Sequence, residues 1–144
     1  MSDYRYEPWT GRPTEFGDLS PFTLERTEFR GVSQAPVHCF PVTLRGQLIG
    51  YLWASESTDA AGFYPRWGMG VAGWEARGAW RRRLKEAWDA GFSAWEAVQF
   101  WVGEPEDPRG GGVAADAEGQ VLPDSQDVYR LTSQYRLTSQ PVEE

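Results

Sequence analysis

The stretch that decides the fold is Trp74–Trp101, WEARGAWRRRLKEAWDAGFSAWEAVQFW. It holds five of the chain's eight tryptophans, at gaps of six, eight, seven and six residues. Large apolar side chains at this near-heptad spacing are typical of one face of a helix. At about 100° per residue, one face of a helix over residues 74–90 would carry the following side chains: Trp74, Trp80, Leu84, Ala87 and Trp88. We expect Trp80, Leu84 and Trp88 to lie in the core.

A second helix is predicted directly after the first. Gly91 suits the end of a helix, where the chain adopts a left-handed conformation. Ser93 and Glu96 then have the spacing of a capping box, which predicts a helix from Ala94 to about Val102. Val98 and Trp101 would join the core from this helix. Gly103, Pro105 and Pro108 follow and would end it.

The residues before this stretch predict a β-hairpin. Val37–Leu44 and Leu48–Ser55 are rich in β-forming residues and flank Arg45-Gly46-Gln47, whose glycine suits a tight turn. Pro41 lacks an N–H for the ladder, so the first strand should be an edge strand or be bulged there.

Other elements have weaker patterns. Phe22–Phe29 alternates like a strand, Ser57–Gly73 has the composition of a loop, and residues 113–115 and 120–122 could pair as a short hairpin. Asp124 suits the cap of a last helix over residues 125–133. The predicted fold class is therefore α+β: a small antiparallel sheet, built from the hairpin around residues 37–55 and short strands, packs against two Trp-rich helices at about 74–90 and 94–102, with a short C-terminal helix.

The domain organisation follows from where these patterns begin and end. Residues 1–21 contain prolines and glycines without periodicity, which favours an extended N-terminal arm. Residues 22–134 would form a single globular α+β domain, and residues 135–144 a flexible C-terminal tail. That tail begins with a second copy of the sequence Tyr-Arg-Leu-Thr-Ser-Gln, which occupies residues 129–134 and 135–140. Two copies are too few for a repeat architecture.

Composition excludes several classes of function. The net charge of −7 argues against nucleic-acid binding, which needs a positive surface. The chain has neither an apolar run of membrane-spanning length nor the N-terminal pattern of a signal peptide, so we expect a cytoplasmic protein without a membrane partner. Arginine far outnumbers lysine, and isoleucine and asparagine are scarce. This bias suggests a GC-rich, bacterial type of genome.

The candidates for catalysis or cofactor binding are few. The single histidine and the single cysteine, His38 and Cys39, are neighbours on a predicted strand and would point to opposite faces. Residues 68–73 match G-x-G-x-x-G, but the dinucleotide-binding fold also needs parallel buried strands, which the sequence lacks. The carboxylates at residues 104–107 and 124–127 suit a surface loop and a helix cap. We therefore expect no metal, no cofactor and no catalytic residue.

Arginines beside the tryptophans supply the remaining hypothesis. Arg77 and Arg81 fall at the edge of the aromatic stripe, where their stems could cover the core while their charges stay in water. Protein interfaces also favour tryptophan and arginine. The sequence thus favours a non-enzymatic protein that binds an acidic or aromatic protein partner through a surface of four residues: Trp67, Trp74, Arg77 and Arg81. The alternative is a small-molecule or carbohydrate-binding domain, with or without weak enzymatic activity, that uses the tryptophans as a pocket.

Overall fold

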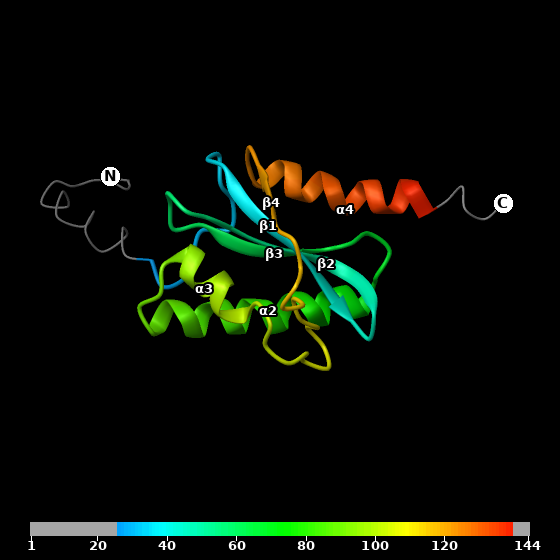
Figure 1. The fold of residues 1–144 in the computed structure, drawn as a ribbon, viewed down its shortest axis with the longest axis horizontal. Helices are drawn as coiled ribbons and strands as arrows, with labels where there is room; N and C mark the ends of the chain where they lie inside the picture. Colours follow the sequence, from blue (N-terminus) through cyan, green and yellow to red (C-terminus); the bar gives the residue numbers. More distant parts are fainter. Residues whose placement is uncertain (1–25, 140–144) are drawn as a thin grey trace, which may run out of the picture.

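The computed structural model describes residues 26–139, and the side chains of residues 26–133. Four strands form one antiparallel sheet in the order β3-β2-β1-β4. Helices α2 and α3 cover one face of the sheet and α4 crosses the other (Figure 1). This arrangement confirms the predicted α+β fold. The elements in chain order are β1 (Val37–Leu44), β2 (Gln47–Ser55), β3 (Ala61–Pro65), α2 (Val71–Asp89), α3 (Ala94–Trp101), β4 (Gln120–Leu122) and α4 (Ser125–Ser139).

The predicted hairpin is formed by β1 and β2. Arg45 and Gly46 both have positive φ, 52° and 82°, which gives the two-residue turn that suits twisted antiparallel strands. Pro41 lies in an inner strand, yet β4 pairs only with residues 37–39 of β1. The backbone of Thr43 bonds to Gly112 on the side of β1 that carries β4, and Pro41, two residues earlier, turns its backbone to the same side. Because β4 does not extend to Pro41, the missing N–H of this proline removes no bond between the two strands.

The helix ends follow the local sequence. Helix α2 begins at Val71 behind Gly70, three residues before the predicted start. It ends where Gly91, at φ 89°, donates to Trp88 and Phe92 donates to Ala87, the pattern of a glycine-terminated helix. Helix α3 has the predicted capping box: Ser93 accepts from the Glu96 N–H, and the Glu96 carboxylate accepts from the Ser93 N–H.

The core between the sheet and helices α2 and α3 contains three of the predicted core residues, Trp80, Leu84 and Val98. Trp88 and Trp101 are only partly buried at its margin, so their assignment to the core was too strong. The prediction that Trp74 shares the buried face of the helix was wrong, because Trp74 is 71% exposed. The reason is that the buried arc of α2 is centred on small residues, with Gly73, Ala76 and Ala79 inward. Small side chains let a helix approach a sheet closely, and this turns Trp74 outward.

A smaller core lies on the opposite face of the sheet, beneath α4. It is built from Val37, Cys39, Trp53, Ala60 and Val128. Helix α4 continues to Ser139, past the predicted end at Ser133, so its backbone includes the first five residues of the predicted tail. The predicted N-terminal arm lies outside the described residues.

Three predictions about the connecting segments were wrong. The predicted loop at residues 57–73 contains strand β3, which runs antiparallel to β2 at the edge of the sheet. Strand β4 pairs with β1 instead of with residues 113–115. The predicted strand Phe22–Phe29 is not formed over residues 26–29, and the rest of it lies outside the described residues.

Candidate functional site

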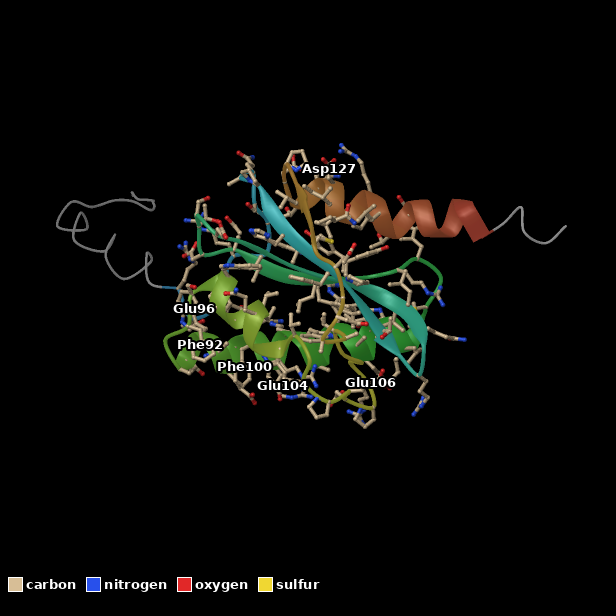
Figure 2. The ribbon with its side chains drawn as sticks, viewed as in Figure 1. Phe92, Glu96, Phe100, Glu104, Glu106 and Asp127 are labelled. Carbon is tan, nitrogen blue, oxygen red and sulfur yellow. The ribbon has the colours of Figure 1, made fainter. Side chains whose placement is uncertain are left out.

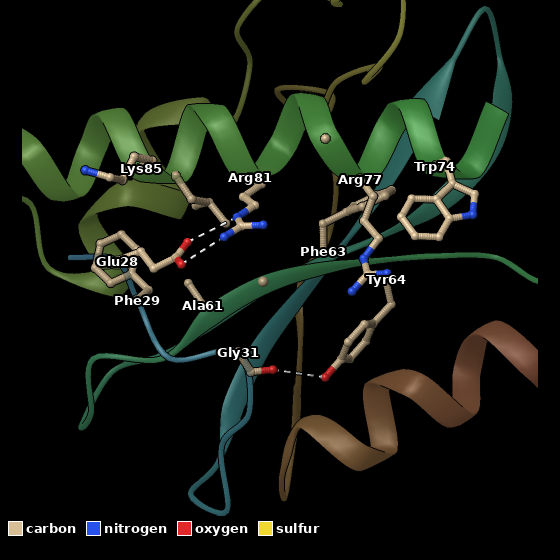
Figure 3. Close-up of a pocket in the computed structure, with 13 residues that line it drawn as sticks. Glu28, Phe29, Gly31, Ala61, Phe63, Tyr64, Trp74, Arg77, Arg81 and Lys85 are labelled. Carbon is tan, nitrogen blue, oxygen red and sulfur yellow. Dashed lines mark hydrogen bonds and ion pairs between the residues drawn. The ribbon is translucent and has the colours of Figure 1, made fainter. Parts of the chain in front are cut away.

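A groove of about 480 Å³ lies between the outer edge of β3 and helix α2 (Figure 3). One side is formed by Trp74, Arg77, Gly78, Arg81 and Lys85, which follow one face of α2. Residues 61–64 of β3 form the other side, and the chain around residues 28–31 closes one end. The groove therefore joins a helix and a strand that the sequence separates by only a short glycine-rich connection.

The segment that closes the groove is held by ion pairs. Arg26 and Arg30 both bond to the carboxylate of Asp59, at 2.7 and 3.1 Å. This fixes Glu28 opposite Arg81, which donates to it from Nη2 at 3.1 Å and from Nε at 3.3 Å. The hydrogen bond to Glu28 raises the pKa of the exposed Arg81 guanidinium. Arg81 is thus already engaged by a carboxylate of this chain.

Arg77 differs from the two cations that follow it on the same helix face. Lys85 pairs with Asp89 at 2.8 Å, and Arg81 pairs with Glu28. Among the side chains of residues 26–133, no carboxylate pairs with Arg77, whose guanidinium lies 5.7 Å from the ring centre of Trp74. It points across the groove toward Tyr64 (Figure 3). Among the described side chains of this groove, Arg77 is therefore the cation without a carboxylate partner.

A second hollow of about 450 Å³ adjoins the groove and shares Tyr64, Trp74 and Arg77 with it. We call it the aromatic hollow because the rings of Trp67 and Tyr129 line it as well. The rings of Trp67 and Tyr129 lie 6.4 Å apart, and those of Tyr64 and Tyr129 5.7 Å apart. Trp67 is 37% exposed and Tyr129 is 43% exposed. Together the groove and the hollow offer apolar ring surface next to a cation.

The structure brings the four sequence-predicted residues to this region. Trp74, Arg77 and Arg81 line the groove, and Trp67 and Trp74 line the aromatic hollow. Two residues of the site, Glu28 and Tyr64, were not predicted from the sequence. Tyr64 lay in a segment predicted to be a loop, and nothing in the sequence relates Glu28 to a residue 53 positions later.

Tyr64 contributes a hydroxyl at the junction of the groove and the hollow. Burial raises the pKa of its phenol, so the group stays protonated at neutral pH and donates to the carbonyl of Gly31 at 3.4 Å. This bond ties the closing segment to β3. The groove thus has one fixed end and opens toward the aromatic hollow.

Arg83, Trp80 and Trp101 stabilise the fold through contacts with one another and with the loop after α3. The guanidinium of Arg83 lies 4.5 Å from the ring centre of Trp80 and 4.4 Å from that of Trp101. Burial lowers its pKa, and its Nη1 donates to the Gly111 carbonyl at 3.4 Å. Trp80 donates from Nε1 to the Gly110 carbonyl at 2.7 Å. These contacts hold the loop after α3 against the core.

The residues weighed for catalysis are dispersed. His38 stacks on Trp95 at 4.0 Å on the helix-covered side, with Nε2 3.3 Å from Glu56. Cys39 points into the other core, where burial raises the pKa of its thiol to about 12. The two side chains therefore face opposite sides of the sheet, as predicted. The residues in the described part of the chain contain no group of three or more potential metal ligands.

The acidic clusters are separated by the sheet. Glu104 and Glu106 lie on the side of α2 and α3, while Asp127 lies beside α4 (Figure 2). Asp107 accepts hydrogen bonds from the backbone N–H groups of Arg109 and Gly110, which shape a loop. Asp124 accepts from the Asp127 N–H, so it caps α4 as expected. In the residues that the structure describes, these carboxylates therefore do not form a common site.

The glycine-rich connection serves the helix. It follows an edge strand of an antiparallel sheet, and its Gly70 caps α2 while Gly73 packs in the first turn beside Met69 and Pro65. This differs from the parallel arrangement of a dinucleotide site. Within residues 26–139 no helix is long and apolar enough to span a membrane. Comparisons with protein families, with curated proteins and with solved structures give no match to this chain.

Proposed function

We propose that this chain is a non-enzymatic cytoplasmic protein that binds an acidic segment of another protein in the groove between α2 and β3. The observation that carries the proposal is the pair Trp74 and Arg77. One is 71% exposed and the other has no carboxylate partner among residues 26–133, and they lie side by side at the opening of the groove.

Charge supports an acidic partner. The protein as a whole carries a net charge of −7, yet the helix side of the groove carries three cations, Arg77, Arg81 and Lys85. Arg81 and Lys85 are paired with Glu28 and Asp89, so the charge of Arg77 is the one left unbalanced among the described side chains. A local positive site on an acidic protein directs an acidic ligand to one place and repels it elsewhere. Arginine and tryptophan are also the residues on which binding energy at protein interfaces concentrates.

A second candidate function is carbohydrate or small-molecule binding in the aromatic hollow. It is favoured because two indoles, Trp67 and Trp74, line one hollow of a size that suits a ligand. The charged side chains of that hollow, Arg66 and Arg77, are both cationic and only donate hydrogen bonds. The hydroxyls of Tyr64 and Tyr129 can accept hydrogen bonds as well. Because every charged side chain of the hollow is cationic, an acidic ligand gains a charge interaction that a neutral sugar would not.

The test compares two charge reversals in the full chain. Arg77→Glu places a carboxylate at the groove, while Arg109→Glu makes the same change in the exposed loop after α3, so each takes the net charge from −7 to −9. Tagged proteins are mixed with a lysate of the organism of origin, cross-linked, and analysed by quantitative mass spectrometry. We expect Arg77→Glu to abolish recovery of a partner that wild type and Arg109→Glu both recover.

Equal recovery by both variants would reject the proposal. If the melting temperature shows that Arg77→Glu is unfolded, Arg77→Gln replaces it, because this change removes the charge without adding repulsion. Recovery of the partner by a folded Arg77→Gln at the level of wild type would then reject the proposal. Arg81→Glu is a poor probe, since it would set a carboxylate against Glu28. Binding of a neutral glycan that Trp67→Ala removes would favour the second candidate.

A further inference from the structure

Among residues 26–139, no strand pairs with the outer edge of β3 beside the groove. In an antiparallel pair, alternate residues turn their N–H and C=O groups toward the neighbouring strand. The Ala60 carbonyl accepts from the N–H of Ser55, so the even-numbered residues of this segment face β2. The backbone groups of Ala61, Phe63 and Pro65 therefore point away from the sheet.

The described residues cover only the beginning of this edge. Arg30 donates to the Asp59 carbonyl at 2.9 Å and accepts from the Ala61 N–H at 3.0 Å, which forms a single parallel bridge. The chain then turns away, and Val32 is 67% exposed. Among residues 26–139, the carbonyl of Ala61 and both backbone groups of Phe63 are left without a backbone partner.

The helix opposite this edge leaves room for a further strand. Gly78 lies in the middle of α2 and lines the groove, and a Cβ at this position would meet no atom within 4 Å. Glycine weakens a helix interior relative to alanine, and no described neighbour requires its small size. A glycine at such a place suits the close approach of another backbone.

We infer that the partner segment binds as an additional β-strand on the outer edge of β3, with a carboxylate side chain at Arg77; this inference rests on the proposed function. An extended segment has free N–H and C=O groups to pair with Ala61 and Phe63, whereas the backbone groups of a helix are already bonded to each other. Alternate side chains of the added strand face α2. One of these is the acidic residue, and its neighbours two positions away lie toward Trp74 and Arg81.

The edge limits what can pair with it. Strand β3 has only five residues, and Pro65 at its end has no N–H to offer. Short edge strands that end in proline resist indiscriminate pairing. Recognition therefore depends on the side chain at Arg77 as well as on the backbone bonds, and this combination gives the groove its specificity.

The experiment begins with a peptide selected against the full chain from a random dodecapeptide library. The selected sequence is expected to contain an aspartate or glutamate among β-forming residues. The peptide is then N-methylated at one residue at a time, because a methyl group removes a backbone donor without changing the side chain. Strand addition predicts that methylation at alternate positions lowers the affinity roughly tenfold and that the positions between them tolerate it.

Two measurements on the protein complete the design. Hydrogen exchange at the Phe63 amide should slow when the peptide binds. Gly78→Gln fills the space beside the edge, so it should abolish peptide binding while the melting temperature stays unchanged or rises, because glutamine favours the helix. Ala72→Gln is the matched control at an exposed position of the same helix and should bind normally.

The results distinguish a failure of strand addition from a failure of the proposed function on which it rests. If the peptide binds and Arg77→Glu weakens it, but no N-methyl position matters and Phe63 exchanges as before, strand addition is refuted and the proposed function stands. If no peptide is selected, or Arg77→Glu has no effect on it, both are refuted. A fall in melting temperature in Gly78→Gln would show that the chain's own residues fill the groove. If the wild-type chain is a dimer and Gly78→Gln alone dissociates it, the groove binds a second copy of this chain. Either of these two results for Gly78→Gln refutes strand addition by a partner.

Discussion

Replacing tryptophan with alanine should have opposite consequences at Trp80 and Trp74, six residues apart on helix α2. Trp80 is fully buried between the sheet and α3. Truncation of a large buried aromatic side chain costs about 3 to 5 kcal/mol. The Gly110 carbonyl would also lose its donor, which costs about 1 kcal/mol more. A loss of about 4 to 6 kcal/mol is a large share of the roughly 5 to 15 kcal/mol that stabilises a typical domain.

Replacing Trp74 with alanine should remove few stabilising contacts. Its side chain is 71% exposed, and its described contact is with Arg77 at 5.7 Å. A cation–π contact at an exposed site is worth about 0.5 to 1 kcal/mol. Alanine favours the helix over tryptophan by roughly 0.5 kcal/mol, which offsets most of that loss. We expect the stability of Trp74→Ala to lie within about 0.5 kcal/mol of wild type.

The assay is urea denaturation of the full chain, followed by far-ultraviolet circular dichroism, for wild type and both variants. The midpoint should fall steeply for Trp80→Ala and stay in place for Trp74→Ala, with similar slopes. Equal losses of unfolding free energy in the two variants would refute this prediction. A loss of more than about 2 kcal/mol in Trp74→Ala would also refute it, because Trp74 would then be packed against the protein and the groove would not be open.

Three further predictions test other parts of the structure. Gly62→Ala should cost about 1 to 3 kcal/mol in urea denaturation, since a Cβ there would lie 2.9 Å from the Trp53 ring; an unchanged midpoint would contradict that packing. The hydrogen bond from the Gly110 backbone N–H lowers the pKa of Asp107 in the folded protein. The ionised Asp107 carboxylate therefore stabilises the fold fully above the unfolded pKa of about 3.9, and this contribution is lost as the pH falls through the lower pKa of the folded state. Asp107→Asn should therefore lose less stability than wild type between about pH 6 and pH 3, and parallel curves would refute this. Burial raises the pKa of Cys39 to about 12, so a disulfide reagent at neutral pH should react fast only in urea, and equal rates with and without urea would show an accessible thiol.

Elements whose signals are local were predictable. The turn at Gly46, the capping box at Ser93 and the helix end at Gly91 each depend on a few consecutive residues, and the structure has all three. Each uses a conformation or a hydrogen bond that its residue type favours wherever it occurs. Their positions therefore follow from sequence without knowledge of the rest of the fold.

Strand β3 could not be predicted in this way. Gly62 and Pro65 are typical of loops, yet both suit their places in this strand. Gly62 lies against the ring of Trp53, which leaves no space for a side chain. Pro65 lies at the end of an edge strand, where its missing N–H has no consequence for pairing with β2. Both reasons depend on neighbours that are distant in sequence.

The candidate site was predictable only from its helix. The spacing of Arg77 and Arg81 relative to the tryptophans placed them at the margin of the buried face, and the structure has them there. The exposure of Trp74 was missed because the periodicity gives equal weight to every apolar residue. In the structure, Ala76 and Ala79 determine which way α2 turns. The positions of strand β3 and of Glu28 at the groove result from contacts between residues that are distant in sequence. The spacing of residues along one helix cannot predict such contacts.

The most direct test of the proposed binding surface is photo-cross-linking in living cells from two positions. A benzophenone amino acid replaces Trp74 at the groove in one variant and Gln99 on the exposed face of α3 in the other. We expect irradiation to join the position-74 variant to another protein through an acidic segment, and the position-99 variant to form no such adduct. Adducts from position 99 with none from position 74 would contradict the account, because the partner would then bind at α3 and not in the groove.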